Sequence, residues 1–331
     1  MVMNKTLVVC SKANFYGKTK KLQNSPLIMS ALKQLKLEES DLNLIILKSS
    51  IKRYILSFVK SPSLVLNVLF LILFRKPTNS IVIEKLKYMI QSTQIIEWEK
   101  ILLDLQPKQI IGIGLPRPLI LATKPMNIPS IEVQHGILTS DNLEFYWKFP
   151  YNNLDCKPSL ILGWDNFFKD IVEDYGIRFV LLNEAWPLTI SRSETKKGKH
   201  NILILLGYKT VFFINFFTIN HELASYLRSL KKVRGEEAFS VKLHPVSYNF
   251  FNKVLARIFF RVSGIKIEFS RNLSLTEILP DFSQVLTSKS ASVWEIWNSR
   301  KEILHFGDLP PDWYDQKIVN SHLFKNMNIN K

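Results

Sequence analysis

The sequence has few of the residues that build covalent cross-links or metal sites. It contains only two cysteines, Cys10 and Cys156, which lie far apart among 331 residues. This excludes a disulfide framework and a cysteine-based metal cluster, and we expect both to be core or strand residues of a reducing compartment. The chain also lacks an Asp-x-Asp pair. The sequence therefore predicts no bound metal, and we expect no cofactor.

The sequence also lacks a long apolar run. A membrane-spanning helix needs about 20 apolar residues, whereas the longest stretch covers residues 61–74, contains Asn67 and is followed by Arg75. Two interpretations of residues 61–76 stay open: a buried helix of the first domain, or a helix lying partly in the lipid interface. The N-terminal apolar run, residues 7–10, is too short for a signal peptide and predicts a first strand.

Acidic residues are outnumbered by basic ones, 28 against 44, so the net charge is +16. Such a chain has three plausible partners: nucleic acid, an anionic membrane surface, or phosphorylated substrates. We find no aromatic residues interleaved with arginine, no zinc-finger spacing and no basic zipper, so nucleic acid is not the expected partner. Hydrophobic residues make up 47% of the chain, enough for a full core.

Short apolar runs alternate with longer helical patterns along the whole chain, which predicts an α/β fold with parallel sheets. Expected strands are residues 6–10, 42–47, 110–114, 130–134, 160–163, 201–206, 239–243, 265–269, 284–287 and 302–306. Expected helices include residues 26–37, 81–105, 117–124, 166–175, 222–233, 248–260, 275–279 and 293–299. A loop-like stretch at 149–158 divides the chain into a domain at 1–158 and a second at 159–331, whose tail could cross back. Ligands of such sheets bind beyond the carboxyl ends of the strands, so we expect the site in a cleft between the domains.

The first candidate lies at the end of strand 130–134. His135 follows Gln134 there, and Gly136 permits a sharp turn that would project the imidazole from the sheet. An imidazole can accept a proton from an attacking hydroxyl near neutral pH. The alternative is an ordinary hydrogen-bonded loop histidine.

The second candidate is the end of strand 239–243, where Lys242 is followed by His244 and Pro245. Proline ends the strand and stiffens the turn, and the Lys and His side chains can donate hydrogen bonds to phosphate oxygens. The alternative is a structural histidine at a strand end.

The third candidate follows strand 284–287, where small hydroxyl residues precede a helix. Ser288, Ser290 and Ser292 and the backbone N–H groups of a helix start can bind an anion. Glu295 would lie in the first turn of that helix, where a carboxylate suits the helix dipole or a ribose hydroxyl. Taken alone, this segment also fits an ordinary helix cap.

Other motifs are incomplete. Gly17-Lys18-Thr19 does not complete a P-loop motif, because Lys12 stands where the first glycine of that motif is required. Gly112-Ile113-Gly114 lacks the third glycine of a dinucleotide site. No Gly-x-Ser-x-Gly elbow of a hydrolase is present.

The three candidates together resemble known bacterial enzymes. Gln134-His135-Gly136 resembles the strand-end His-Gly of capsule and teichoic-acid transferases, including polyol-phosphate polymerases. Lys242-Leu243-His244-Pro245 resembles the His-Pro motif of bacterial sialyltransferases and Kdo transferases. Ser290-Ala291-Ser292 resembles the Ser-Ser or Ser-Thr motif that follows it in those families, although Ala291 separates the hydroxyls and the acidic motif of sialyltransferases is absent.

The resemblance implies a GT-B glycosyltransferase of capsule or O-antigen synthesis, with two Rossmann-like domains facing a cleft. The second domain would hold a nucleotide-sugar donor, with a CMP-linked acidic sugar favoured, through His244, Lys242 and Ser290 or Ser292. His135 would be the general base or a phosphate ligand. The first domain would take a lipid-linked or growing glycan on the cytoplasmic face of the membrane, with Gln134, Gly136, Arg117 and Asp141 on the acceptor side. Two alternatives stay open: a CDP-polyol phosphotransferase, and a non-catalytic glycan- or membrane-binding component.

Overall fold

The computed structural model divides the chain into two compact units, with the division along the chain after Ala185. Each unit is described by itself. None of the helices in the described part is long and apolar enough to cross a membrane. The residues that the structure describes are 5–11, 25–47, 80–138, 155–182, 202–206, 223–232, 239–243, 250–270, 274–288, 290–307 and 313–327.

The first unit is built on a six-stranded sheet in which every neighbouring pair is parallel. The order of its strands is β2-β1-β3-β4-β5-β6. They are β1 (Thr6–Ser11), β2 (Leu42–Leu47), β3 (Gln109–Gly112), β4 (Ser130–Val133), β5 (Leu160–Gly163) and β6 (Arg178–Leu181). The helical segments are α1 (Pro26–Gln34), η3 (Glu39–Asp41), α4 (Ser80–Leu105), α5 (Arg117–Thr123), η4 (Asn166–Phe168) and α7 (Lys169–Asp174).

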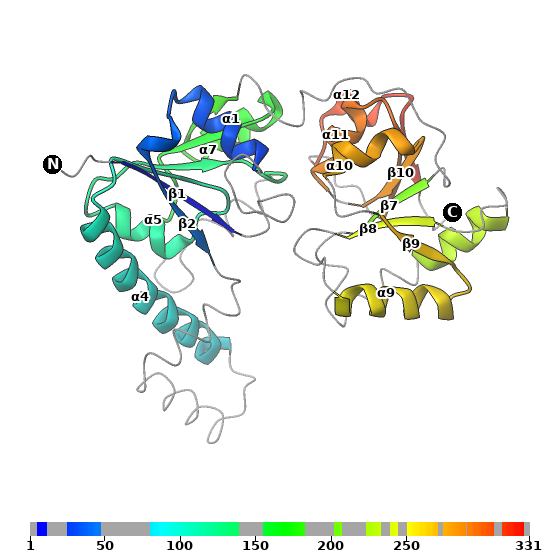
Figure 1. The fold of residues 1–331 in the computed structure, drawn as a ribbon, viewed down its shortest axis with the longest axis horizontal. Coiled ribbons are helices and arrows are strands. Elements are labelled where there is room, and N and C mark those ends of the chain that lie inside the picture. Colours follow the sequence, from blue (N-terminus) through cyan, green and yellow to red (C-terminus); the bar gives the residue numbers. More distant parts are fainter. Residues whose placement is uncertain are drawn as a thin grey trace. The chain divides into compact units, whose positions relative to one another are not determined.

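One face of this sheet forms a core with the helices α4 and α5 (Figure 1). Leu7 and Val9 of β1 pack there with Trp98 and Leu102 of α4 and Leu119 of α5. Alternate residues of a strand point to opposite faces, so Val8, which is also fully buried, belongs to the other face. A sheet covered on both faces explains why these strands are continuous apolar runs.

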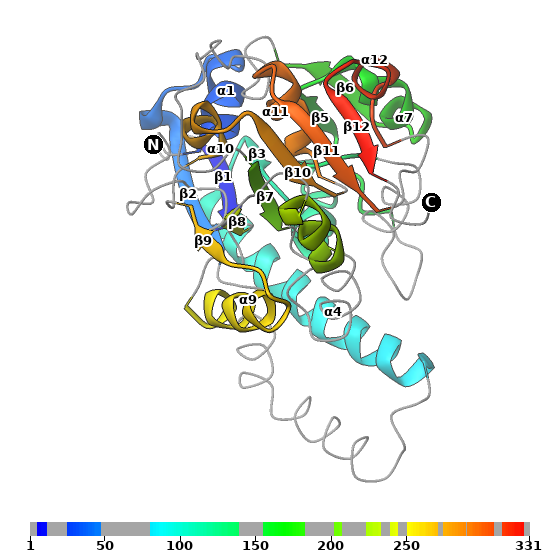
Figure 2. The ribbon, with the colours of Figure 1, turned by 90° about the vertical axis from the view of Figure 1, so that its right-hand side faces the viewer.

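The second unit repeats this plan with another six-stranded parallel sheet, in the order β12-β11-β10-β7-β8-β9. Figure 2 shows β10, β11 and β12 side by side. The strands are β7 (Ile202–Leu206), β8 (Phe239–Leu243), β9 (Ile267–Phe269), β10 (Gln284–Thr287), β11 (Glu302–Phe306) and β12 (Phe324–Met327). The helical segments are residues 223–232, α9 (Phe250–Val262), α10 (Leu275–Ile278), η7 (Leu279–Asp281), α11 (Ser292–Asn298) and α12 (Gln316–Val319).

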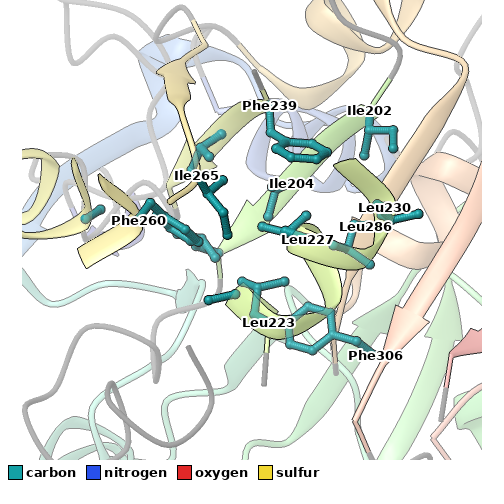
Figure 3. Close-up of a cluster of buried hydrophobic side chains, with 14 of the residues drawn as sticks. Ile202, Ile204, Leu223, Leu227, Leu230, Phe239, Phe260, Ile265, Leu286 and Phe306 are labelled. Atoms are coloured by element: carbon teal, nitrogen blue, oxygen red, sulfur yellow. The ribbon is translucent and has the colours of Figure 1, made fainter. Parts of the chain in front are cut away.

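The main core of this unit lies between the sheet and the two helices 223–232 and α9 (Figure 3). Phe239, Val241 and Leu243 of β8 point into it, together with Leu227 and Phe260 from the helices. Because side chains alternate along a strand, Ser240 and Lys242 point to the opposite face of β8. This alternation directs the one basic residue of the strand away from the main core.

The expected α/β class with two Rossmann-like sheets is confirmed. The boundary differs from the expected 158/159, because β5 pairs with β4 and β6 pairs with β5, which extends the first unit to Ala185. The strand β6 was not expected, and β11 is not the final strand, since β12 pairs beside it. The candidate lipid-facing residues 61–76 lie outside the described residues.

Candidate functional site

The order of the strands singles out one place on each sheet. In an open parallel sheet, ligands bind at the carboxyl ends of the two strands where the order of connection reverses. In the first sheet this reversal falls between β1 and β3, and in the second between β7 and β10. The turn before α5 follows β3, and the Ser288–Ser292 segment follows β10. Both places carry polar side chains, and the sequence alone identified only some of them as candidates.

At the first place, a glycine turn binds a carboxylate from the neighbouring strand. A Cβ on Gly112 would clash with the Val9 carbonyl, and Gly114 adopts φ +64°, which favours glycine. The resulting turn directs the N–H groups of Gly114 and Leu115 at Glu132 of β4. Gly114 donates to Oε1 at 2.6 Å, and Leu115 donates to Oε2 at 2.9 Å. The two glycines therefore build an anion-binding turn that is occupied by the protein's own carboxylate.

This carboxylate lies beside the candidate histidine. Burial raises the pKa of Glu132 from 4.5 to about 7, and the two backbone N–H bonds oppose that rise. The Nδ1 atom of His135 lies 4.0 Å from Glu132 Oε1, and the histidine side chain is 55% exposed. The structure therefore places an accessible imidazole at the end of β4, as expected, and adds a carboxyl group that exchanges its proton near neutral pH.

Gln134 forms the support beneath this pair. Its side chain is buried, its Nε2 donates to the Gly136 carbonyl at 2.9 Å, and its Oε1 accepts from the Trp164 N–H at 3.4 Å. Its own N–H donates to the Leu162 carbonyl at 3.0 Å. The side chain thus connects the turn that carries His135 to the end of β5. That Gln134 or Gly136 contacts the acceptor glycan stays a prediction.

At the second place, Tyr314 fixes the serine segment. The buried Tyr314 hydroxyl accepts from the Ser290 N–H at 2.9 Å and donates to the Ser288 carbonyl at 3.3 Å. The helix α11 begins with Ser292, whose N–H donates to Ser290 Oγ at 3.2 Å, while the N-cap residue itself is Ala291. Ser290, one position before the N-cap residue, therefore accepts the capping hydrogen bond. The Tyr314 hydroxyl holds Ser288 and Ser290 by one hydrogen bond each.

Two buried ionisable groups, Lys242 and Glu295, affect each other's pKa, and Glu295 lies in the first turn of the helix that follows this segment. Lys242 of β8 and Glu295 in the first turn of α11 are 9% and 4% exposed. Burial lowers the pKa of Lys242, opposed by the charges of Glu295 and Glu277. Burial raises the pKa of Glu295 well above its usual range, opposed by the charge of Lys242. Among the described residues, Glu295 Oε2 has no hydrogen-bond partner. The site thus contains a buried carboxylate oxygen that is available to a ligand donor.

The remaining predicted residues are placed only in part. His244, Pro245 and Asp141 lie outside the described residues. Arg117 is the first residue of α5, where its charge lowers the pKa of the Cys156 thiol against the effect of burial. Both cysteines are buried, and burial raises the pKa of Cys10 to about 12, which does not suit a thiolate nucleophile. In the described part, no three His, Cys, Asp or Glu side chains are grouped as metal ligands.

Three contributors were not singled out from the sequence: Glu132, Tyr314 and Glu277. A carboxylate within the apolar strand 130–133 is the signal that could have identified Glu132, because buried strands rarely carry an unpaired charge. Nothing in the sequence links Tyr314 to a segment 24 positions upstream. Glu277 belongs to a recognisable capping box with Ser274, but its effect on Lys242 depends on the fold.

Two Rossmann-like units in tandem, each a parallel sheet with helices on both faces, define the chain as an α/β protein of the GT-B class. Solved structures share this fold. UDP-GlcNAc 2-epimerase from Neisseria meningitidis, bound to UDP-GlcNAc, has a TM-score of 0.57 at 13% identity, over 98% of this chain and 87% of that one. MnaA of S. aureus with UDP has a TM-score of 0.56 at 13% identity, over 92% and 79%.

A third structure, UDP-GlcNAc 2-epimerase from Methanocaldococcus jannaschii, has a TM-score of 0.52 at 12% identity, over 98% of this chain and 89% of that one. The sequence matches no family model and no curated protein sequence. Identities of 12–13% establish the shared fold and not a shared reaction.

Proposed function

We propose that this protein is a metal-independent glycosyltransferase that uses a nucleotide-sugar donor. The observation that carries the proposal is the polar cluster at the strand-order reversal of the second sheet. There, the serine segment held by Tyr314 leads into α11, whose first turn carries the buried Glu295, and the charge of the buried Lys242 acts on that carboxyl group. Serine hydroxyls and an ammonium group suit phosphate oxygens, and a buried carboxylate suits the vicinal hydroxyls of a ribose.

Each residue has a role in this proposal. Lys242, Ser290 and Ser292 bind the donor phosphates and stabilise the charge that develops on the leaving nucleotide. Glu295 accepts hydrogen bonds from the ribose through Oε2. His135 takes the proton of the attacking hydroxyl, and the carboxyl of Glu132, 4.0 Å away, stabilises the imidazolium that forms. His244, expected to bind the phosphate, completes this set.

The acceptor in this proposal is a lipid-linked or growing surface glycan of capsule or O-antigen synthesis, on the cytoplasmic face of the membrane. The motif resemblance favours a CMP-linked acidic sugar, whereas the structural neighbours were solved with UDP or UDP-GlcNAc. A CDP-linked polyol donor fits the same residues.

Nucleotide binding is the first test. Titration calorimetry with CMP, CDP, UDP and GDP should identify one preferred nucleotide. Glu295→Gln should weaken its binding about 10- to 100-fold, because one of the two carboxyl oxygens is replaced by an amide NH₂ group that cannot accept a hydrogen bond from a ribose hydroxyl. Glu302→Gln on β11 is the matched control, since that carboxylate bonds to Gln284 and Lys325 within the protein. Equal effects of the two substitutions would contradict the assigned nucleotide site.

Transfer is the second test. With the preferred nucleotide sugar and an extract of lipid-linked glycans, nucleotide release should depend on the acceptor. His135→Ala should lower the rate about 10²- to 10⁴-fold and leave nucleotide affinity unchanged. Unchanged transfer in both His135→Ala and His244→Ala would overturn the catalytic assignment and favour a non-catalytic binding component.

A second candidate is suggested by the structural neighbours: a 2-epimerase of a UDP-sugar. An epimerase would change UDP-GlcNAc without any acceptor, and the sugar would stay attached to the nucleotide. Following UDP-GlcNAc by NMR separates the two functions. Acceptor-free conversion to a second UDP-sugar would support the epimerase, whereas UDP released only with acceptor would support the transferase.

A further inference from the structure

The helix α9 exposes apolar side chains on the side that faces away from the core. Ala256 and Phe260 are buried against the second sheet. Ile258 and Val262 lie one turn apart on the opposite side and are 55% and 84% exposed. Large apolar side chains at this exposure normally occur singly on a monomer surface. Two of them in line form an apolar strip that is available to a partner.

This strip is surrounded by positive charge. The helix α9 and the neighbouring helix 223–232 carry three basic residues each and no acidic residue. Both pack on the same face of the second sheet, and Figure 1 shows helix 223–232 near one end of α9. Lys231 Nζ lies 3.5 Å from the Gly264 carbonyl, which places this cation at the same end of α9 as Val262. The basic residues are Arg228, Lys231, Lys232, Lys253, Arg257 and Arg261.

Part of this charge is held in place by packing. The guanidinium of Arg257 lies 5.3 Å from the centre of the Phe269 ring, and Lys253 Nζ lies 5.9 Å from it. Arg257 and Arg261 are both exposed and lie one turn apart, beside the apolar strip. In the described part, the acidic residue nearest to α9 in the sequence is the half-buried Glu268 of β9, whereas Glu222, Glu236 and Glu237 lie outside the described residues. The two helices thus present fixed cations around apolar side chains.

We propose that this surface, the α9 face, binds the anionic lipid surface of a membrane. It consists of Ile258 and Val262 with the exposed basic residues of α9 and of helix 223–232. Lipid head groups complement the cations while the apolar strip enters the acyl boundary. A nucleic acid would use the cations alone and leave Ile258 and Val262 in water, so it fits the face less well. The α9 face contains none of the residues assigned to the nucleotide site.

The first experiment measures the binding of the full chain to vesicles by co-sedimentation. Binding should be strong to phosphatidylcholine mixed with phosphatidylglycerol and weak to phosphatidylcholine alone. The double variant Ile258→Ser/Val262→Ser should bind the anionic vesicles about tenfold more weakly, because it loses the apolar contact. Arg257→Gln/Arg261→Gln should lose a similar factor and much of the salt dependence. The matched control is Ile96→Ser/Leu103→Ser on α4, which removes two apolar side chains of 53% and 62% exposure and should bind as the wild type does.

A second experiment reports the insertion directly and does not depend on loss of binding. Cys10 and Cys156 are buried, so Val262→Cys allows selective labelling with an environment-sensitive fluorophore. Its emission should shift to the blue with anionic vesicles and stay unchanged with RNA, and the label at Leu103→Cys should stay unchanged with both. Neither experiment requires the proposed transfer activity, so the two proposals fail separately. Unshifted emission at Val262→Cys, equal losses in the α4 control, or a shift with RNA would each overturn the α9 face as a membrane contact.

Discussion

Two glutamates, the largely buried Glu132 in the first unit and the fully buried Glu295 in the second, occupy comparable places in their units. Each lies near the carboxyl end of a parallel sheet where the strand order reverses. Glu132 accepts two backbone N–H bonds from a glycine turn. The positive charge of Lys242 offsets part of the cost of burying Glu295, and Glu295 Oε2 has no hydrogen-bond partner among the described residues. One carboxylate is therefore satisfied by the fold, and the other leaves an acceptor for a ligand.

The comparison shows how one architecture provides two kinds of site. A carboxylate that is bound by rigid backbone donors cannot bind a substrate hydroxyl, but it can orient a neighbouring histidine and hold its charge. A carboxylate that is balanced only by a side chain keeps its hydrogen-bonding capacity, at a cost to stability that ligand binding offsets. We expect substitutions at the two places to differ accordingly.

The largest effect on stability is expected for Lys242→Met. It leaves Glu295 buried without a compensating charge, which should lower the free energy of unfolding by about 3–5 kcal/mol. Because Lys242 lowers the pKa of Glu295, its removal raises that pKa further, so the loss should be smaller near about pH 5 than near about pH 8. Urea unfolding at the two pH values measures both effects.

The double variant Lys242→Met/Glu295→Gln separates a charge effect from a packing effect. It removes both charges, so it should recover most of the lost stability. A double variant as unstable as Lys242→Met would show that the two residues do not compensate each other.

The next effect concerns the first unit and depends on pH. The folded state raises the pKa of Glu132 from 4.5 to about 7, so it binds the proton more tightly than the unfolded chain does. The contribution of this group to stability is fully present below about pH 4.5 and is lost as the pH rises to about 7, by about 3 kcal/mol in all. Glu132→Gln cannot titrate and should lack this change. Urea unfolding of the wild type and Glu132→Gln between these two pH values should give a difference in unfolding free energy that varies with pH. A constant difference would contradict the raised pKa of Glu132.

A smaller effect is expected where the histidine turn meets β5. A Cβ on Gly163 would clash with the Phe179 ring and lie 3.0 Å from Gln134 Oε1. Gly163→Ala should therefore lower the free energy of unfolding by about 1–3 kcal/mol through overpacking. Gly136→Ala is the control, since its Cβ would meet no atom within 4 Å. Similar losses in both variants would show that Gly163 is not sterically required.

The smallest effect on stability is expected for Tyr314→Phe in the second unit. The ring and its contacts with Trp294 and His305 stay, while the two bonds to Ser288 and Ser290 are lost. We expect a loss of about 1–2 kcal/mol in unfolding free energy and a clearly weaker affinity for the preferred nucleotide, because the serine segment is no longer fixed. Calorimetry checks this; full affinity in the variant would remove Tyr314 from the site.

The sequence predicted most of the scaffold because buried parallel strands are short apolar runs between polar breaks. Strands 42–47, 160–163, 239–243, 284–287 and 302–306 have the observed bounds. The strand β12 was missed because Lys325 and Asn326 give this edge strand a polar composition. The domain boundary was misplaced because the pairing of β5 with β4 joins segments about 30 residues apart, and no local pattern encodes it.

The positions of the candidate residues were predictable where strand ends identify them. Strand ends direct attention to His135, Lys242 and Ser290, and all three occur at the predicted positions in their units. Glu132 and Tyr314 were missed because their roles depend on contacts with residues 17–26 positions away. A histidine in a turn is visible in a sequence, whereas the carboxyl group 4.0 Å from it is brought there by the folded sheet.

The bond from Tyr314 to the serine segment has a consequence for the order of folding during synthesis. Chains fold largely as they leave the ribosome, N-terminal parts first. Strands β7 to β11 precede Tyr314 along the chain, so five of the six strands of the second sheet are made before the residue that fixes Ser288 and Ser290. Until Tyr314 has been synthesised, a nascent chain therefore has most of this sheet but lacks the hydroxyl that bonds to Ser288 and Ser290.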